Sequence, residues 1–332
     1  MSALRAAAMV LLGGLAFCSS TAGKETRYLT GSPADVRPRL YGPAHNFGGG
    51  STDVVPAMQW MIDQVRGCRD CGRTLDAVVL RASGANGYNA LIYALAGIDS
   101  VETLVVTDRA DAESDAVNET VRGAEIIFFA GGDQCNYVRF FKDTKTERSV
   151  RGVYERGGGI GGTSAGLAIQ GGIVYDACSG GSAKSVEALA HPYHRDISFT
   201  YDFFNWRYLH DVITDTHFAE RDRLGRLLAY LARQLAEKKR RRVLGIGVGE
   251  KTSLVIDRCG LAQVIGAGSV YFIIADHQPA SCVRGAPLTY RNFKVWKKMA
   301  GENFDLQKLP QQGFQLISVE SGRIDSQPIP IK

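Results

Sequence analysis

The chain has 332 residues, of which 45% are hydrophobic and 22% are charged, and its formal net charge at pH 7 is +5. This length excludes a disulfide-stapled mini-domain, and the composition excludes wholesale disorder. The modest positive charge does not by itself argue for a nucleic-acid partner. Glycine is in excess, at 38 residues against 10 prolines, and gathers in short clusters beside apolar runs, which favours tight strand-to-helix turns.

The first segment, Met1–Gly23, has the layout of a cleavable export signal: Arg5, an apolar stretch from Ala6 to about residue 17, then small residues. A membrane anchor is the competing interpretation, although the apolar stretch is short for a bilayer-spanning helix. A lipoprotein cleaved at Cys18 is a further alternative, but the bulky Phe17 fits that cleavage site poorly. We predict an exported protein, periplasmic or extracellular, without membrane association after cleavage, in which residues 24–332 form a single domain.

Beyond the signal, short apolar runs alternate with stretches of helical spacing. The predicted strands are Ala77–Leu80, Thr103–Val106, Glu125–Ala130, Gly159–Thr163, Val212–Thr214 and Val243–Val248. The predicted helices are Pro56–Val65, Gly87–Leu95, Asn136–Phe141 and Arg221–Lys239. This alternation indicates an α/β fold with a mostly parallel, doubly wound sheet. A C-terminal antiparallel hairpin region at the sheet edge is predicted from Ser253–Ile256, Leu261–Ile265 and Val270–Ile274, with a later strand at Gln315–Val319.

The strongest chemical signal is the run Gly162-Thr163-Ser164-Ala165-Gly166, which follows a predicted strand and precedes a short predicted helix, Leu167–Gln170. This G-x-S-x-G pattern is typical of a nucleophile elbow, in which a serine stands at a strained turn between small neighbours. The amide of Ala165 can then donate to a developing oxyanion. An ordinary glycine-rich turn with an incidental serine is the alternative.

A serine nucleophile needs a base, and the base needs a carboxylate to orient it. His217 and Glu250 each follow a predicted strand, as Ser164 does, and the carboxyl ends of parallel strands line one edge of a sheet. We therefore predict a triad of Ser164, His217 and Glu250. The other histidines of the chain lack this context or fall among turn residues: His45, His191, His194, His210 and His277.

A second glycine turn, Gly131-Gly132-Asp133-Gln134, follows the apolar run Ile126–Phe129. Its exposed amides can supply another oxyanion donor. A strand-capping turn is an equal alternative, and phosphate binding has less support because no Lys-Ser/Thr pair follows. A later basic run, Lys238–Arg242, ends a predicted helix, where cations offset the helix dipole, and no aromatic residues are interleaved with it. We predict no nucleic-acid partner.

Export changes how the cysteines are interpreted. Removal of Met1–Gly23 would leave an even number, which an oxidising compartment allows to pair: Cys68, Cys71, Cys135, Cys178, Cys259 and Cys282. The connectivity cannot be deduced from sequence. A zinc site or a redox dithiol at Cys68 and Cys71 is the alternative, but no second pair lies at ligand spacing. A zinc site from His191 and His194 is also conceivable. We predict no metal and no organic cofactor.

Four motifs in order resemble the cyanophycinase and peptidase E family: residues 130–134, 162–166, 216–227 and 245–250. The resemblance runs from about Tyr41 to Ile274 and includes the strand end Leu80–Gly84. It implies a flavodoxin-like, class I glutamine-amidotransferase-like fold, a Ser-His-Glu triad at the three residues named above, and a homodimer. It also implies an oxyanion hole from the amides of Gly132 and Ala165.

By the same resemblance Gln134 and Arg221 would hold the substrate, and we assign Asp133 to this group as well. One departure is Gly249, where many cyanophycinases carry an acidic residue before the triad glutamate. This departure bears on polymer specificity more than on hydrolysis.

Cyanophycin is a poly-aspartate backbone with arginine on each β-carboxyl, and the resemblance implies its cleavage to β-Asp-Arg dipeptides. Its guanidinium groups require carboxylates in the cleft. Four carboxylates are near the triad segments in sequence: Asp176, Asp196, Asp202 and Glu220. The alternatives are a peptidase E-like hydrolase of aspartyl dipeptides, an esterase of the α/β-hydrolase type, and a non-enzymatic binder of peptides rich in aspartate and arginine.

Overall fold

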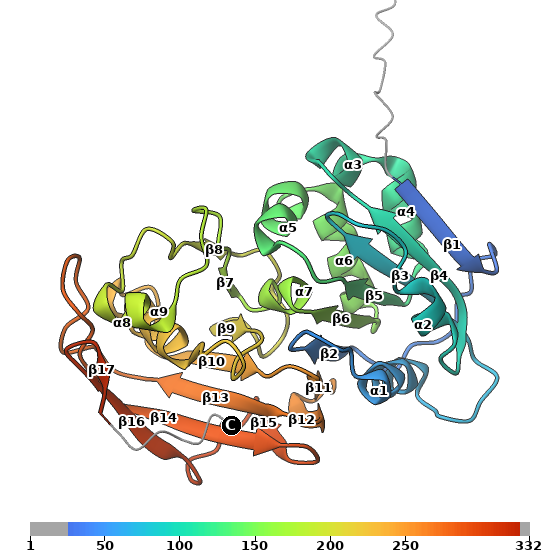
Figure 1. The fold of residues 1–332 in the computed structure, drawn as a ribbon. Helices are drawn as coiled ribbons and strands as arrows, with labels where there is room; N and C mark the ends of the chain where they lie inside the picture. Colours follow the sequence, from blue (N-terminus) through green and yellow to red (C-terminus); the bar gives the residue numbers. More distant parts are fainter. Residues whose placement is uncertain (1–25, 326–332) are drawn as a thin grey trace, which may run out of the picture.

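Two large β-sheets organise the protein. The computed structural model describes residues 26–325, whose strands form a nine-stranded sheet, a six-stranded sheet and a two-stranded ribbon. In Figure 1 the two large sheets occupy neighbouring lobes. The predicted export signal, Met1–Gly23, lies outside the described residues. Within residues 26–325 no helix combines the length and the apolar character needed to cross a bilayer.

The nine-stranded sheet has the order β1-β4-β3-β5-β6-β2-β11-β12-β15. Its strands are β1 (Thr26–Gly31), β2 (Ala44–Gly48), β3 (Leu75–Arg81), β4 (Ile98–Val105), β5 (Ile126–Phe129), β6 (Gly159–Thr163), β11 (Thr252–Ile256), β12 (Leu261–Gly266) and β15 (Asn303–Asp305). The five central strands, from β4 to β2, pair in parallel, and the flanking pairs are antiparallel. The predicted α/β fold with a mostly parallel central sheet is confirmed.

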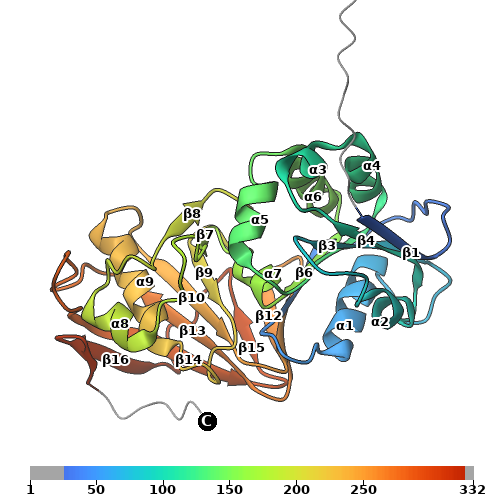
Figure 2. The ribbon, with the colours of Figure 1, turned by 45° about the horizontal axis from the view of Figure 1, so that its top comes forward.

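Helices cover both faces of this parallel centre (Figure 2). One face carries α1 (Val55–Arg66) and α2 (Asn89–Tyr93); the other carries α3 (Arg109–Glu113), α4 (Asp115–Gly123), α5 (Gln134–Phe141) and α6 (Lys145–Glu155). Successive residues of a strand point to opposite faces. Phe128 accordingly packs in the cluster with Met61 of α1, whereas the next residue, Phe129, packs in the cluster with Phe141 of α5.

The second sheet has the order β17-β16-β14-β13-β10-β9. Its strands are β9 (Val212–Asp215), β10 (Val243–Val248), β13 (Ser269–Ala275), β14 (Tyr290–Met299), β16 (Gln315–Glu320) and β17 (Arg323–Ile324). The helices α8 (Ser185–Ala190) and α9 (Leu224–Ala236) pack on it, and the ribbon of β7 (Ile173–Tyr175) and β8 (Phe199–Tyr201) lies beside them. The assignment of residues 24–332 to one domain stays a prediction.

The strands after β8 are distributed differently from the sequence-based expectation. β9 and β10 do pair in parallel, but they start the second sheet instead of extending the first. The predicted C-terminal hairpin is divided as well, because β11 and β12 lie in the first sheet and β13 lies in the second. The connection from β12 to β13 begins at Gly266, whose φ is +122°. A Cβ there would lie 2.4 Å from the Lys251 carbonyl oxygen, so the turn requires glycine.

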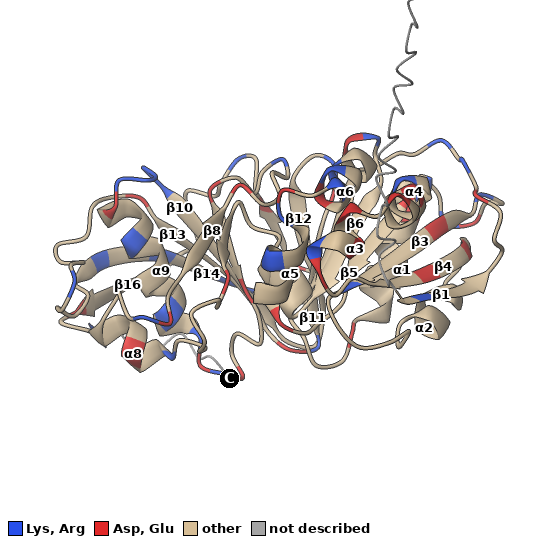
Figure 3. Cartoon of the chain, turned by 90° about the horizontal axis from the view of Figure 1, so that it is seen from above, with Lys and Arg blue, Asp and Glu red and all other residues tan. Residues whose placement is uncertain are grey.

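The helix predicted over Arg221–Lys239 is shorter at both ends, since α9 covers Leu224–Ala236. Before it, Asp222 has a φ of 47°, and the Arg223 guanidinium donates to the Thr216 carbonyl at 2.8 Å, so this segment forms turns. After it, Lys238 has a φ of 54°. The basic run thus lies beyond the helix. Figure 3 shows acidic and basic residues distributed over both lobes.

Candidate active site

Ser164 stands at a sharp turn between β6 and α7 (Ala165–Ala168), with φ 52° and ψ −117°. A positive φ is costly for a residue with a side chain, so the surroundings must support it. A Cβ on Gly162 would lie 2.5 Å from the Gly166 carbonyl oxygen, and one on Gly166 would lie 2.1 Å from the Phe129 carbonyl oxygen. The glycines of the motif are therefore required by close backbone approach. The helix begins two residues earlier than the predicted Leu167–Gln170.

The structure brings the three predicted triad residues together. His217 Nε2 lies 2.8 Å from Ser164 Oγ, and His217 Nδ1 lies 2.6 Å from Glu250 Oε1. A carboxylate can only accept hydrogen bonds, so Nδ1 donates to Glu250 and Nε2 is left to accept the hydroxyl proton of Ser164. This arrangement is the one that proton removal from a serine requires.

The electrostatics keep the imidazole neutral and the carboxylate ionised. Burial lowers the pKa of His217, and the positive charge of nearby Arg221 acts in the same direction, against the hydrogen bond to Glu250. The hydrogen bond from His217 lowers the pKa of Glu250. A general base must be unprotonated to act, so both shifts favour base function at neutral pH.

A glycine loop that sequence reasoning missed encloses the triad. It comprises residues Gly48–Asp53 and begins at the last residue of β2. The Gly48 carbonyl accepts from the Ser164 amide at 3.0 Å, and the Gly49 carbonyl accepts from the His217 amide at 2.8 Å. The Ser51 side chain is near enough to Glu250 to lower the pKa of its carboxyl. One segment therefore lies against all three triad residues, and its signal in the sequence was three glycines in succession, Gly48 to Gly50.

Gly50 is the member of the glycine loop that packs on the imidazole. Its φ is +111°, and a Cβ there would lie 2.3 Å from His217 Cε1 and 2.5 Å from Nε2. These distances are far inside ordinary van der Waals contact, so a side chain at this position would displace the ring. The absence of a Cβ at Gly50 therefore helps to set where the base stands.

A buried ion pair holds the segment that carries His217. Arg226 Nε donates to Asp215 Oδ2 at 2.7 Å, and Arg226 Nη2 donates to Asp215 Oδ1 at 2.5 Å. The same Oδ1 accepts from the Thr216 amide at 2.8 Å. The attraction of Asp215 outweighs the effect of burial, so the pKa of Arg226 is raised. His217 itself has a φ of 44°, and this network holds the two residues that precede it.

The predicted oxyanion residues belong to two turns beside Ser164, and the predicted substrate residues Asp133 and Gln134 follow one of these turns. Ala165 is the first residue of α7, so its amide is among those that a helix start leaves without an intrahelical acceptor. Gly131 is close on the other side, because a Cβ there would lie 3.5 Å from Ser164 Cβ, and Gly132 follows with φ +150°. Gln134 begins α5, where Asp133 Oδ1 accepts from the Cys135 amide at 2.8 Å as an N-cap.

Arg221 extends from the turn after His217. Its amide donates to the His217 carbonyl at 3.1 Å, and its side chain is exposed. Its charge lowers the pKa of both His217 and Glu250, which places the guanidinium within electrostatic range of the triad.

No family model matches the chain. A cyanophycinase from Trichormus variabilis is 30% identical over 216 residues, which is 63% of this chain and 66% of the relative. A cyanophycinase from Synechococcus elongatus is 28% identical over 279 residues, which is 78% of this chain and 80% of the relative. The chain belongs to the cyanophycinase and peptidase E family.

A solved structure of a peptidase from an acI-B1 actinobacterium has the same fold, with a TM-score of 0.55 and 17% identity over 81% of this chain and 98% of that one. The cyanophycinase-family chain described here spans 66% of the length of the first curated relatives it matches.

Most of the carboxylates near the site already have partners in this family member. Asp176 accepts from the Thr200 hydroxyl at 2.8 Å and from the Cys178 amide at 2.9 Å. Glu220 Oε2 accepts from the Glu250 amide at 3.0 Å. A Cβ on Gly249 would lie 3.5 Å from Glu220 Oε1, so an acidic residue there would meet a like charge. The Glu220 carboxylate therefore lies beside Gly249, the position at which many cyanophycinases carry an acidic residue.

Asp196 is 3.7 Å from the His194 Nδ1, and Asp202 is exposed at a turn with φ 56°. His194 is thus paired with a residue of its own loop.

The other histidines also lie apart from the triad. His45 is buried against Phe47, Tyr154 and Trp206, and burial lowers its pKa to about 3. His277 Nδ1 is 3.0 Å from Asp276 Oδ1. His191 and His210 are exposed. Within residues 26–325 no group of three potential metal ligands comes together.

Two disulfides are present within residues 26–325. One joins the neighbours Cys68 and Cys71, and the other joins Cys135 of α5 to Cys178, in the segment after β7. The second bond ties the turn that carries Gln134 to the second lobe. Cys259 is an exposed thiol and Cys282 a buried one.

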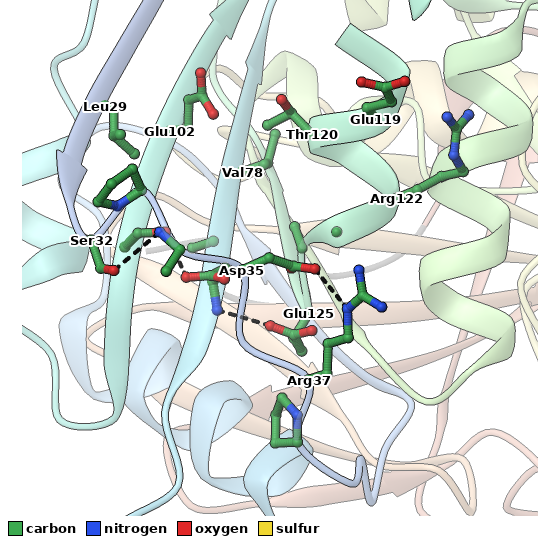
Figure 4. Close-up of a pocket in the computed structure, with 18 of the residues that line it drawn as sticks. Leu29, Ser32, Asp35, Arg37, Val78, Glu102, Glu119, Thr120, Arg122 and Glu125 are labelled. Atoms are coloured by element: carbon green, nitrogen blue, oxygen red, sulfur yellow. Dashed lines mark hydrogen bonds and ion pairs between the residues drawn. The ribbon is translucent and has the colours of Figure 1, made fainter. Parts of the chain in front are cut away.

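A hollow of about 900 Å³ lies at the end of the central sheet where its parallel strands begin, opposite the end that carries the triad (Figure 4). The segment 32–38 lines it, together with the starts of β3 and β5. The Val36 amide donates to Asp76 Oδ2 at 2.9 Å, and the Asp76 amide donates to Glu125 Oε2 at 2.9 Å. Burial raises the pKa of Glu125 to about 7. Because Ser164 follows the carboxyl end of β6, this hollow is separate from the triad.

Proposed function

We propose that this chain is an exported serine exopeptidase that hydrolyses cyanophycin to β-Asp-Arg dipeptides. The observation that carries the proposal is the hydrogen-bonded row of Ser164, His217 and Glu250, with 2.8 Å and 2.6 Å between the bonded atoms. Family membership, and curated relatives that are named cyanophycinase, support the substrate class.

In the proposed reaction Ser164 Oγ attacks an aspartyl amide carbonyl while its proton moves to His217 Nε2. The C–N bond then breaks, and His217 returns the proton to the departing amine. Water, deprotonated by His217, next attacks the acyl ester and releases the acid and the free serine. Glu250 orients the imidazole and stabilises its cation throughout.

The amides of Gly132 and Ala165 are the proposed donors to the oxyanion that forms in both steps. Gln134, Asp133 and Arg221 are the proposed substrate-binding residues. Support for Arg221 is electrostatic, because its exposed guanidinium acts on both His217 and Glu250 and can meet a substrate carboxylate. Asp133 already caps α5, so its proposed contact with substrate would use the oxygen that does not accept from Cys135.

The test is mass spectrometry of the products after purified cyanophycin is incubated with the protein and with Ser164→Ala. We expect β-Asp-Arg dipeptide from the wild type and intact polymer from the variant. Intact polymer with the wild type, beside cleavage of small aspartyl dipeptides, would support the peptidase E-like alternative instead. Hydrolysis of short acyl esters without either amide substrate would favour an esterase.

Export is a separate proposal, supported by the layout of Met1–Gly23. Expression with the full chain, followed by N-terminal sequencing of the protein recovered outside the cytoplasm, tests it. A mature chain that starts after the small residues 19–23 is expected. A full-length chain that stays with the membrane fraction would favour the anchor.

A further inference from the structure

The last residue of the glycine loop, Asp53, lies beside the proposed nucleophile. β2 pairs in parallel with β6 so that Gly48, the first residue of the loop, is opposite Thr163, the residue before Ser164. Asp53 Oδ2 accepts from the Tyr88 hydroxyl at 2.9 Å, and the Thr163 side chain is near enough to lower the pKa of the carboxylate. The Thr163 hydroxyl is itself buried without a hydrogen-bond partner. Asp53 therefore lies near the residue that precedes the reacting serine, at the end of the sheet where the triad stands.

The carboxylate of Asp53 lacks a cationic partner. No ion pair joins it to a basic side chain within residues 26–325. Arg81 is the basic residue beside Tyr88; its guanidinium carbon is 5.8 Å from the Tyr88 ring centroid, and its Nε donates to the Ser83 carbonyl. Burial raises the pKa of Asp53, against the opposing effects of the Tyr88 hydroxyl that donates to it and of nearby Thr163. This half-buried anion is therefore incompletely compensated.

Other carboxylates around the site, unlike Asp53, have a cationic, imidazole or backbone amide partner. Asp215 has Arg226, Glu250 has His217, and Glu220 accepts from the Glu250 amide. Asp133 caps α5. Asp53 combines nearness to Ser164 with an unmatched charge.

We propose that Asp53 is a specificity-determining residue that binds a cationic substrate group beside Ser164, and that this group is a guanidinium. The inference rests on the proposed function, since it supplies the arginine recognition which that function requires. A guanidinium can bond a carboxylate through two N–H groups. The Tyr88 ring already has Arg81 over it, so the proposed contact is made by the Asp53 carboxylate. The Tyr88 hydroxyl holds one carboxylate oxygen in place for this contact.

The test measures binding, so it does not depend on turnover. Ser164→Ala protein is titrated by calorimetry with β-Asp-Arg, with β-Asp-citrulline, and with N-acetyl-β-Asp-Arg. Citrulline replaces the guanidinium with a neutral urea of similar shape, and acetylation removes the α-ammonium. We expect β-Asp-Arg to bind about tenfold or more tightly than the citrulline dipeptide, the size of a lost charged hydrogen bond.

Adding Asp53→Asn should abolish this preference by weakening only the arginine ligands. Glu119→Gln, an exposed carboxylate at the opposite edge of the sheet, is the matched control and should leave the preference unchanged. If Asp53→Asn unfolds, Tyr88→Phe repeats the test, because it frees one Asp53 oxygen without removing the charge and should reduce the preference in part.

Equal affinities for the arginine and citrulline dipeptides, no binding of either, or an unchanged preference in Asp53→Asn would overturn the proposal. If acetylation of the α-ammonium weakens binding but replacement of arginine by citrulline does not, the assignment to a guanidinium is overturned. Failure of the proposed function can be told apart from failure of this inference. The proposed function fails if cyanophycin stays intact with the wild type, whatever affinities the dipeptides show.

Discussion

Substituting alanine for Gly50 should inactivate the protein by moving its base. The new Cβ would lie 2.3 Å from His217 Cε1, whereas ordinary contact begins at 3.4 Å, so the ring or the loop must recede by roughly 1 Å. The 2.8 Å contact between His217 Nε2 and Ser164 Oγ cannot survive that shift intact. Misplacement of a catalytic group by about 1 Å costs on the order of 100-fold in rate, so kcat should fall by about that factor.

The control is Gly180→Ala. Gly180 has a φ of +100°, close to the +111° of Gly50, but a Cβ there meets nothing within 4 Å. Both variants should lose about 1–3 kcal/mol of folding stability from the unfavourable backbone conformation. Only Gly50→Ala should lose activity, measured as kcat on the amide substrate together with the thermal midpoint. A folded Gly50→Ala protein with wild-type kcat, or equal small losses in both variants, would refute the reasoning.

Three further outcomes are expected. Because burial lowers the pKa of His217, the neutral base persists below pH 6.5, so the acid limb of kcat/KM should have its midpoint below 6.5; a midpoint above 6.5 contradicts this. Asp215→Asn leaves the buried Arg226 guanidinium without its carboxylate and should cost about 3–5 kcal/mol in urea unfolding, whereas a negligible loss would contradict the network. Removing the bond between Cys135 and Cys178 by a double alanine substitution should cost about 2–4 kcal/mol under oxidising conditions, and an unchanged thermal midpoint would argue against it.

The parts of the fold that sequence could predict are those whose signal is local. β3 and β5 are short runs of apolar residues between turns, and the amphipathic stretches around them gave α1, α5 and the body of α9. The positions of Ser164, His217 and Glu250 followed from one topological rule, that residues after parallel strands gather at one edge. The rule worked for His217 and Glu250 although their strands, β9 and β10, belong to the second sheet.

The parts that sequence could not predict depend on pairing between distant segments. β2 reads Ala-His-Asn-Phe-Gly, without the apolar run of its neighbours, and it is a central strand only because β6 and β11 pair with it on either side. The glycine loop that follows was therefore missed, and Asp53 with it. The ion pair between Asp215 and Arg226 could not be predicted either, because the packing of α9 on the second sheet brings Arg226 to Asp215.

The central claim is that Ser164 has a hydroxyl made nucleophilic by His217. The most direct measurement is the rate and site of labelling by a fluorophosphonate probe, followed by peptide mass spectrometry. We predict a label on Ser164 in the wild type, none in Ser164→Ala, and a rate reduced by orders of magnitude in His217→Ala. A label on another residue, or a rate in His217→Ala equal to that of the wild type, would contradict it.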